Sequence, residues 1–233
     1  MDTVQVAPNV WALHFPVVQA YVVRWESGAA LIDSGVTGSE QAILGALRRL
    51  RVGPGWPTQL RYILLTHCHD DHAGAAAAVA AATGAAVLAG SDDAAVIRGT
   101  AQEPVPVLHN LEQEFYAAIS PSVPPSPPTR VDRELSEGDE LDWGEPARIM
   151  HIPGHTPGSI AVHLPDSRLV FSGDTVAVVD GRPKLGVFNV DRAGTVAAFR
   201  RLAELDFDTV CAGHREALVG GAGAALRAVA ATL

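Results

Sequence analysis

The sequence predicts an α+β fold in which strands and helices alternate along most of the chain. Short, mostly apolar runs, such as residues 61–65 and 168–171, have the length and composition of buried strands. Alanine-rich segments, such as the one that begins at Ala73, instead have the composition of helices. A chain of 233 residues can bury a large core, so residues 1–233 are expected to form a single domain.

The order of the expected elements follows from these patterns. Strands are expected at about residues 3–13, 20–25 and 29–32, followed by a helix at 39–51, a strand at 61–65 and a polar loop. A helix from Ala73 ends at Gly84, because glycine readily adopts the left-handed conformation that closes helices, and a short strand at 85–88 follows. The second half predicts strands at 139–143, 147–152, 159–164 and 168–171, a helix at 192–205, a strand at 209–212 and a last helix near the C-terminus.

The polar loop after residues 61–65 holds four potential metal ligands: His67, His69, Asp71 and His72. On a helix, residues two apart point to nearly opposite sides, so His67 and His69 reach one ion only from an extended or looped segment. The end of the strand provides that geometry and leaves Asp71 and His72 free to serve a second position, so the spacing predicts two metals side by side. Imidazole and carboxylate groups suit zinc, and iron or manganese would also accept them. The alternative is a polar loop whose aspartates cap the next helix.

Three further sites share one form, in which an apolar run is followed by glycine and then by a potential ligand. They are Gly154-His155, Gly173-Asp174 and Gly213-His214. Glycine lets the chain turn sharply as it leaves a sheet, so the next side chain is presented at the rim. Together with the first cluster, these residues complete two coordination spheres.

These motifs, in this order, resemble those of the metallo-β-lactamase superfamily. The resemblance runs from about Val10 to the end of the chain. It implies a four-layer αββα sandwich, with two mixed β-sheets packed face to face, helices outside and a metal site at one rim. The residues that carry it are His67-x-His69-x-Asp71-His72, Gly154-His155-Thr156-Pro157-Gly158-Ser159, Ser172-Gly173-Asp174-Thr175 and Gly213-His214.

The resemblance also implies a ligand set and a chemistry. It assigns one Zn²⁺ to His67, His69 and His155 and a second to Asp71, His72 and His214, with Asp174 bridging. Asp33 would support the site from behind the ligands; the alternative for Asp33 is an Asx turn after a strand. A hydroxide between the metals would attack the substrate, and Asp71 or Asp174 would orient it and carry a proton to the leaving group.

The expected function is hydrolysis of a small ester, thioester or lactone. The β-lactamases of the superfamily lack the bridging aspartate, so Asp174 disfavours β-lactams, and the tyrosine that lactonases commonly place after this residue is replaced by Thr175-Val176-Ala177. Only nineteen residues follow His214, which predicts that the glutathione-binding C-terminal domain of glyoxalase II is absent. Two alternatives remain: a persulfide dioxygenase-like oxidoreductase with one iron, and a metal-stabilised binding protein without turnover.

Residues 103–130 hold seven of the sixteen prolines. In the superfamily the corresponding insertion often covers the metal cleft, so the segment is expected to be a lid that places His109, Phe115 and Tyr116 on the substrate wall. The alternative is a helix of ordinary core contacts at 107–119, followed by a linker. Lys184 could receive a substrate carboxylate or phosphate, or could belong to a solvated turn.

Composition limits the partners and the compartment. The net charge of −9 and the pI near 5.4 argue against a nucleic-acid partner and favour a small-molecule substrate. No signal peptide is visible at the start of the chain, and the Ala- and Gly-rich run at 73–90 does not suit a membrane span, so a cytoplasmic protein is expected. The oligomeric state is not predicted.

The remaining cysteines and histidines are expected to be structural. Cys68 and Cys211 should be reduced, although Cys68 could act near the second metal. The isolated histidines His14, His151 and His163 are expected not to bind metal.

Overall fold

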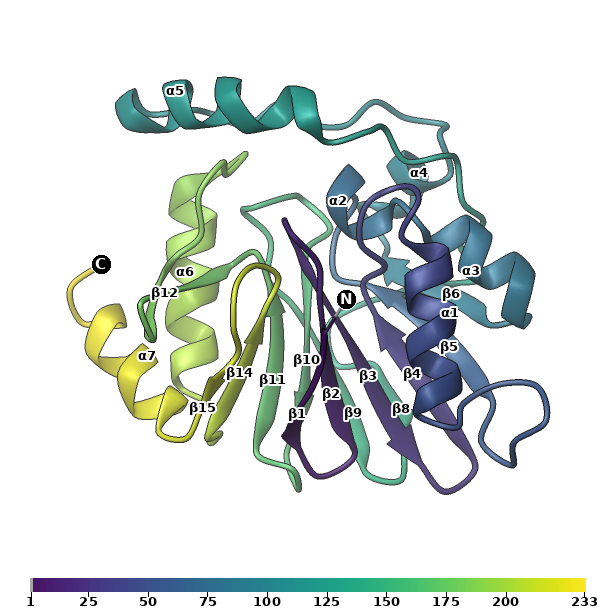
Figure 1. The fold of residues 1–233 in the computed structure, drawn as a ribbon. Helices are drawn as coiled ribbons and strands as arrows, with labels where there is room; N and C mark the ends of the chain where they lie inside the picture. Colours follow the sequence, from purple (N-terminus) through teal and green to yellow (C-terminus); the bar gives the residue numbers. More distant parts are fainter. Residues whose placement is uncertain (1) are drawn as a thin grey trace.

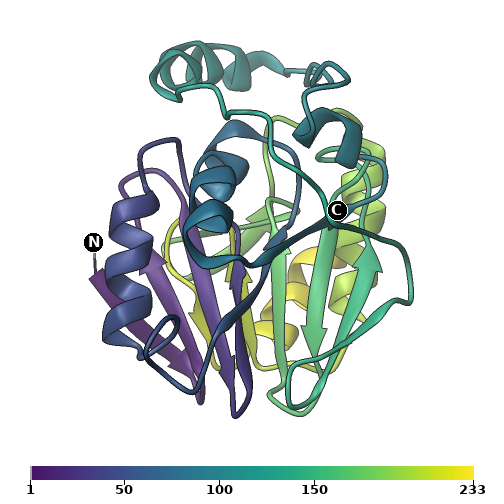
Figure 2. The same ribbon diagram turned by 90° about the vertical axis from the view of Figure 1, so that its right-hand side faces the viewer.

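Two stacked β-sheets form the centre of the computed structural model, which describes residues 2–233 except for the side chain of Asn110 (Figures 1 and 2). Helices α1 (Glu40–Arg49) and α3 (Ala76–Thr83) cover the outer face of one sheet. Helices α6 (Arg192–Ala203) and α7 (Ala222–Ala230) cover the outer face of the other. The four-layer αββα sandwich expected from the sequence is confirmed.

Each sheet mixes parallel and antiparallel pairs. The first sheet follows chain order: β1 (Asp2–Ala7), β2 (Val10–His14), β3 (Gln19–Trp25), β4 (Gly28–Ile32), β5 (Leu60–Leu65), β6 (Ala86–Gly90) and β7 (Arg133–Leu135). The second has the spatial order β15 (Leu218–Val219), β14 (Thr209–Ala212), β11 (Leu169–Gly173), β10 (Ile160–Leu164), β9 (Pro146–His151) and β8 (Glu140–Asp142). A separate hairpin contains β12 (Val176–Val179) and β13 (Arg182–Leu185), and short helical turns occur at α2 (Asp70–Ala73), α4 (Ala94–Ile97) and η1 (Ser120–Ser122).

The structure corrects two expected segments. The single strand expected at 3–13 is a hairpin of β1 and β2, which turns at Asn9 with a φ of 61°. Lys184, for which a solvated turn was the alternative, lies on strand β13, paired with β12. Asp180 and Gly181, with φ values of 51° and 67°, form the turn between these strands. An Asp-Gly pair between two short strands is a strong hairpin signal because both residues tolerate positive φ.

Three hydrophobic clusters hold the layers together. Alternate residues of a strand face opposite sides, so on β5 Leu64 packs between the two sheets whereas Ile63 and Leu65 pack under the outer helices. The parallel strands β5 and β6 are buried on both faces, which explains their nearly continuous apolar sequences. Because both sheets share the central cluster, we infer that the described residues form one domain.

The topology gathers polar residues at one rim. In the first sheet β4, β5 and β6 are parallel, and in the second β11 is parallel to β14. The carboxyl ends of these strands lie at the upper rim in Figure 1, on the side of the sandwich where helix α5 (Asn110–Ile119) lies outside the sheets (Figures 1 and 2). Within residues 2–233, no helix is long and apolar enough to cross a membrane.

Replacement of Phe171 provides a test of the packing between the two sheets. Its side chain is 1% exposed and packs edge-on against Tyr21, with ring centroids 5.4 Å apart. Phe171→Ala should lower the free energy of unfolding by about 3–5 kcal/mol, because the lost apolar burial leaves a cavity between two sheets. Chemical denaturation measures this difference. The matched control is Phe115→Ala on α5, where the side chain is 51% exposed. Equal destabilisation by the two substitutions would contradict the layer assignment.

Candidate metal centre

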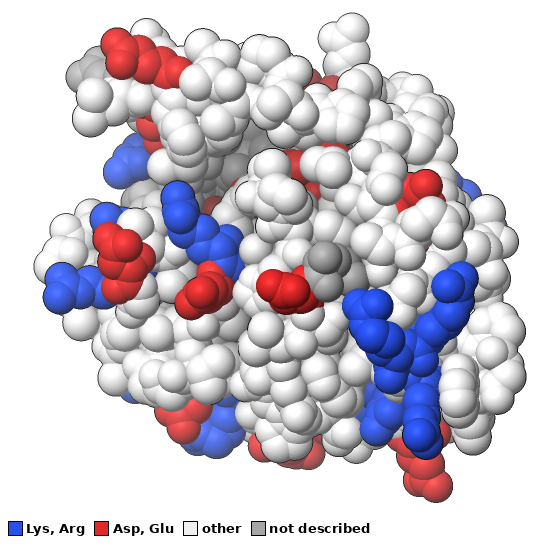
Figure 3. Space-filling view, in the orientation of Figure 1, with Lys and Arg blue, Asp and Glu red and all other residues white. Residues whose placement is uncertain are grey.

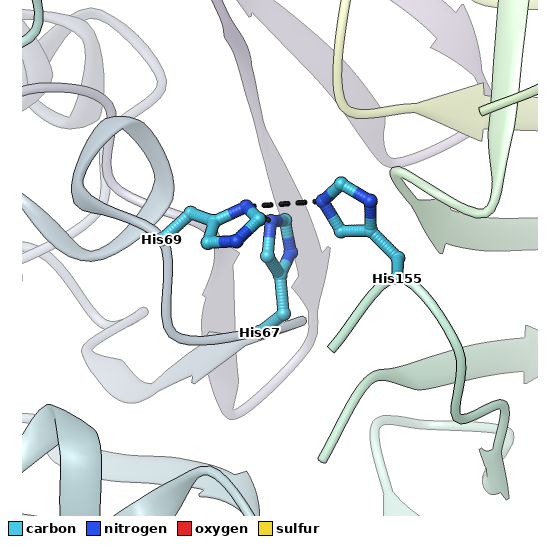
Figure 4. A group of neighbouring side chains, drawn as sticks. All are labelled: His67, His69 and His155. Atoms are coloured by element: carbon cyan, nitrogen blue, oxygen red, sulfur yellow. Dashed lines mark hydrogen bonds between the residues drawn. The ribbon is translucent and has the colours of Figure 1, made fainter. Parts of the chain in front are cut away.

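Three histidines converge at the first position. Figure 4 shows the rings of His67, His69 and His155 pointing toward one another. His69 Nδ1 lies 3.0 Å from His67 Nε2 and 3.0 Å from His155 Nε2. Two nitrogens bound to one tetrahedral zinc at about 2.0–2.1 Å would lie roughly 3.3 Å apart, so the observed separations suit a shared metal ion.

A second group lies next to the first. Asp71, His72 and His214 place one potential ligand atom each within 4.8 Å of one another, and so do His67, His72 and Asp174. Asp174 stands between the groups: its Oδ2 is 2.9 Å from His214 Nε2 and 3.7 Å from His155 Nε2. The structure therefore brings together all seven residues that the sequence motifs singled out.

Asp33 underlies both groups. Its Oδ2 accepts hydrogen bonds from His72 Nδ1 at 2.9 Å and from the Thr66 hydroxyl at 2.8 Å, and its Oδ1 accepts from the Thr66 amide. Since the Thr66 hydroxyl donates to Asp33, its oxygen accepts from His67 Nδ1, 3.0 Å away. One carboxylate thus fixes two rings so that each Nε2 faces the centre as a lone pair.

These orientations give a direct test of whether a cation fits the site. His72 Nε2 and Asp174 Oδ1 are buried, lie 3.3 Å apart and have no hydrogen-bond partner among the described residues. His67 Nε2 and Asp174 Oδ1 offer lone pairs to the same small volume. Burial lowers the pKa of His72, but Asp174 and Asp71 outweigh burial and raise that pKa well above its ordinary value, so this small volume attracts a positive charge. A divalent cation bound by imidazole and carboxylate groups would supply that charge and satisfy the buried atoms in place of a proton. The donor set fits such an ion.

The electrostatics agree with this fit. Burial, reinforced by neighbouring imidazoles, lowers the pKa of His67 well below its ordinary value. Burial also lowers the pKa of His69 and of His155 to about 4, so these three rings are neutral and free to bind metal at pH 7. Burial acts in the same direction on His214, but Asp174 outweighs it and raises the pKa of His214 to about 9. The second group thus attracts positive charge.

The three motif glycines serve two different purposes. Gly154 and Gly173 have φ values of 139° and 48°, in agreement with the sharp turns expected from the sequence. Gly213 instead provides room: a Cβ atom there would lie 2.1 Å from Asp174 Oδ1 and 2.6 Å from His72 Cε1. His214 follows directly, and its Nδ1 donates to the Val17 carbonyl at 2.7 Å.

Asp93 is a site residue that sequence reasoning missed. This fully buried carboxylate accepts from the Cys68 amide at 2.9 Å, from the Thr156 hydroxyl at 2.7 Å and from the Gly158 amide at 2.8 Å. It therefore joins the loop that carries His67 and His69 to the loop that carries His155. The available signal was its position, because Asp93 follows parallel strand β6 at the same rim as the histidines.

Residues 103–130, the expected lid, contact the rim that carries the two groups at several points. Beneath α5 the molecular surface is hollowed (Figure 3). Phe188, in the loop after β13, packs against Phe115 and Tyr116 with ring centroids 5.4 and 5.1 Å apart. The Val107 amide donates to the Asn189 carbonyl, and on the other side the Ser126 amide donates to Asp70 Oδ1. None of the residues 111–119 is buried, so the alternative of ordinary core contacts is wrong.

Other expected residues lie outside the two groups. His109 is the exposed N-cap residue of α5, and Lys184 is exposed on β13, without a hydrogen bond or ion pair to any described residue. Cys68 and Cys211 are free and buried, and burial raises the pKa of both thiols. Within residues 2–233, no potential metal-binding group includes His14, His151 or His163.

The chain belongs to the metallo-beta-lactamase superfamily, whose family model matches residues 15–214. It is 34% identical over 166 residues to hydroxyacylglutathione hydrolase of Cereibacter sphaeroides (strain ATCC 17029 / ATH 2.4.9), an alignment that covers 70% of this chain and 51% of the relative. It is 25% identical to "Probable metallo-hydrolase YflN" of Bacillus subtilis (strain 168), with 93% of this chain and 87% of that protein covered. The chain spans about half the length of the hydroxyacylglutathione hydrolases it matches.

The fold is also similar to that of a solved metallo-β-lactamase with a HARLDQ motif from Cronobacter sakazakii. The TM-score is 0.70 at 24% identity, and the match covers 92% of this chain and 78% of that one. At this identity the likeness concerns the fold alone.

Asp93 gives a test of how the centre is built. Asp93→Ala should weaken zinc binding by about 10–100-fold, because residues that orient ligand-bearing loops contribute at that level. Competition with a chromogenic chelator measures the affinity. Asp92→Ala is the matched control, since the neighbouring side chain is 58% exposed. If both variants bound zinc as the parent does, Asp93 would have no part in shaping the centre.

Proposed function

We propose that this chain is a metal-dependent hydrolase that cleaves a small ester, thioester or lactone. The observation that carries the proposal is the position of Asp174 between two groups of imidazole ligands, with donor atoms in each group within 4.8 Å of one another. Seven ligand residues exceed what one tetrahedral ion can use, so we infer two ions per chain, with zinc as the metal.

The candidate ligand residues would have distinct roles in binding the two ions and in catalysis. His67, His69 and His155 would hold one ion, Asp71, His72 and His214 the other, and Asp174 both. When bound, such a pair supplies a water acidified toward neutral pH and a Lewis acid for the substrate carbonyl. The side chains of Asp71 and Asp174 are 16% and 13% exposed, so both can reach a water in the hollow. We infer that one of them orients this water and passes its proton to the leaving group.

The substrate class rests on two observations. Relatives at 34–36% identity are named hydroxyacylglutathione hydrolases, which favours a thioester. The lid adds an apolar component: Val105 is 83%, Leu111 85% and Phe115 51% exposed, and Phe188 lies against Phe115. Exposed apolar side chains beside a hollow favour an acyl group or ring with an apolar part.

The direct test is a hydrolysis screen of the zinc-loaded protein with thioesters, esters, lactones, phosphodiesters and β-lactams. We expect turnover of the carbonyl substrates, thioesters foremost. Asp174→Ala should reduce kcat by at least about a hundredfold, since even residues that merely orient ligands contribute up to that much. Asp166→Ala, an exposed aspartate of the β10–β11 turn, is the matched control and should retain activity.

Two results would overturn the proposal. One is an absence of hydrolysis of every carbonyl substrate by fully loaded protein. The other is oxygen uptake by a chain that carries one iron, which would support the persulfide dioxygenase alternative.

The lid's role in substrate selection can be tested by comparing KM for thioesters with long and with short acyl groups. Phe115→Ala should raise KM severalfold for thioesters with a phenylacetyl or hexanoyl group, because each lost apolar contact weakens binding. The same substitution should leave KM for acetyl thioesters and the zinc content unchanged, since Phe115 is not in any potential ligand group. Steady-state kinetics across this series provides the measurement. An equal change for short and long acyl groups would remove Phe115 from the substrate wall.

A further inference from the structure

His69 differs from the other histidines of the centre in the nitrogen that it turns inward. His67, His72 and His155 turn Nε2 toward the neighbouring ligands, whereas His69 turns Nδ1 toward His67 and His155 (Figure 4). Its Nε2 therefore points away from the centre. A neutral imidazole carries one proton, so His69 can offer a lone pair at Nδ1 only if that proton is on Nε2.

Glu103 faces this outer nitrogen. Its Oε1 lies 3.3 Å from His69 Nε2, and the two side chains are 40% and 15% exposed. An ionised carboxylate attracts a proton to the ring nitrogen that it faces, so the contact favours the ring with its proton on Nε2. The other outward nitrogens with a partner are held by Asp33, by Thr66 and by the Val17 carbonyl. The partner of His69 is instead Glu103, the first residue of the lid.

Residues near the end of the lid contact the same ligand loop and a residue beside it. The Ser126 amide donates to Asp70 Oδ1 at 2.7 Å, and the Thr37 hydroxyl donates to the Pro125 carbonyl at 3.0 Å. Asp70 directly precedes Asp71, a residue of the second group. The beginning and the end of the lid thus contact two consecutive residues of the ligand loop, His69 and Asp70.

We propose that Glu103 is a positioning residue for His69, through which the lid sets the metal affinity of the first group. The inference rests on the proposed metal centre. The Glu103 carboxylate, 3.3 Å from His69 Nε2, favours a proton on that nitrogen, which fixes the tautomer and the ring orientation and keeps the Nδ1 lone pair directed at the position shared with His67 and His155. If the lid moves so that Glu103 leaves His69, the His69 ring loses this partner and is held less firmly.

The experiment has a readout that does not require turnover. Nitrogen-15 NMR of the metal-free full chain should show His69 with its proton on Nε2, and Glu103→Ala should give a mixture of tautomers. Zinc affinity, measured by chelator competition, should fall by about 10–100-fold in Glu103→Ala and less in Glu103→Gln, whose amide oxygen can still face the proton on Nε2. Glu114→Ala, on the exposed part of α5, is the control and should match the parent in both measurements.

An unchanged His69 tautomer together with unchanged zinc affinity in Glu103→Ala would overturn the inference. Such a result is distinct from failure of the proposed function, which would be seen in the parent chain as an absence of zinc binding or of hydrolysis.

Discussion

Buried acceptor atoms that face one another at the upper rim require a positive charge between them, and the surrounding structure depends on this requirement. His72 Nε2 and Asp174 Oδ1 have no hydrogen-bond partner in the described chain, although His72 Nδ1 donates to Asp33 and Asp174 Oδ2 lies 2.9 Å from His214 Nε2. Leaving such atoms unsatisfied costs about 1–3 kcal/mol each. A divalent cation removes that cost and turns a destabilising cluster into a binding site.

The scaffold holds this cluster with carboxylates that are not themselves in the potential ligand groups. Asp33 orients His72 directly and His67 through Thr66, and Asp93 joins the two histidine-bearing loops. Glu103 contacts His69 from the lid. Ligand-bearing loops at the ends of parallel strands are mobile by nature, so this outer layer of hydrogen bonds supplies the precision that a metal centre needs.

The sequence predicted most of the strands and the seven clustered residues from local signals: strand-length apolar runs, and ligands placed directly after them. The αββα layers were instead implied by the resemblance to the metallo-β-lactamase superfamily. The sequence did not predict Asp93 or Glu103, because their partners lie 25 and 34 positions away and only tertiary packing brings them together. The hairpin at 176–185 carried a readable signal in Asp180-Gly181. The turn at Asn9 also carried a readable signal in Pro8-Asn9, between two short runs that the prediction joined into one strand. The sequence left open whether residues 107–119 form a core helix, and exposure decided against it.

The number of metal ions bound per chain tests the central claim most directly. Metal-free protein dialysed to equilibrium against excess Zn²⁺ and then analysed for its elemental content should hold two equivalents, because Asp174 faces two separate groups of imidazoles. Saturation at one equivalent, or the absence of bound zinc, would contradict the account of a shared carboxylate between two ions.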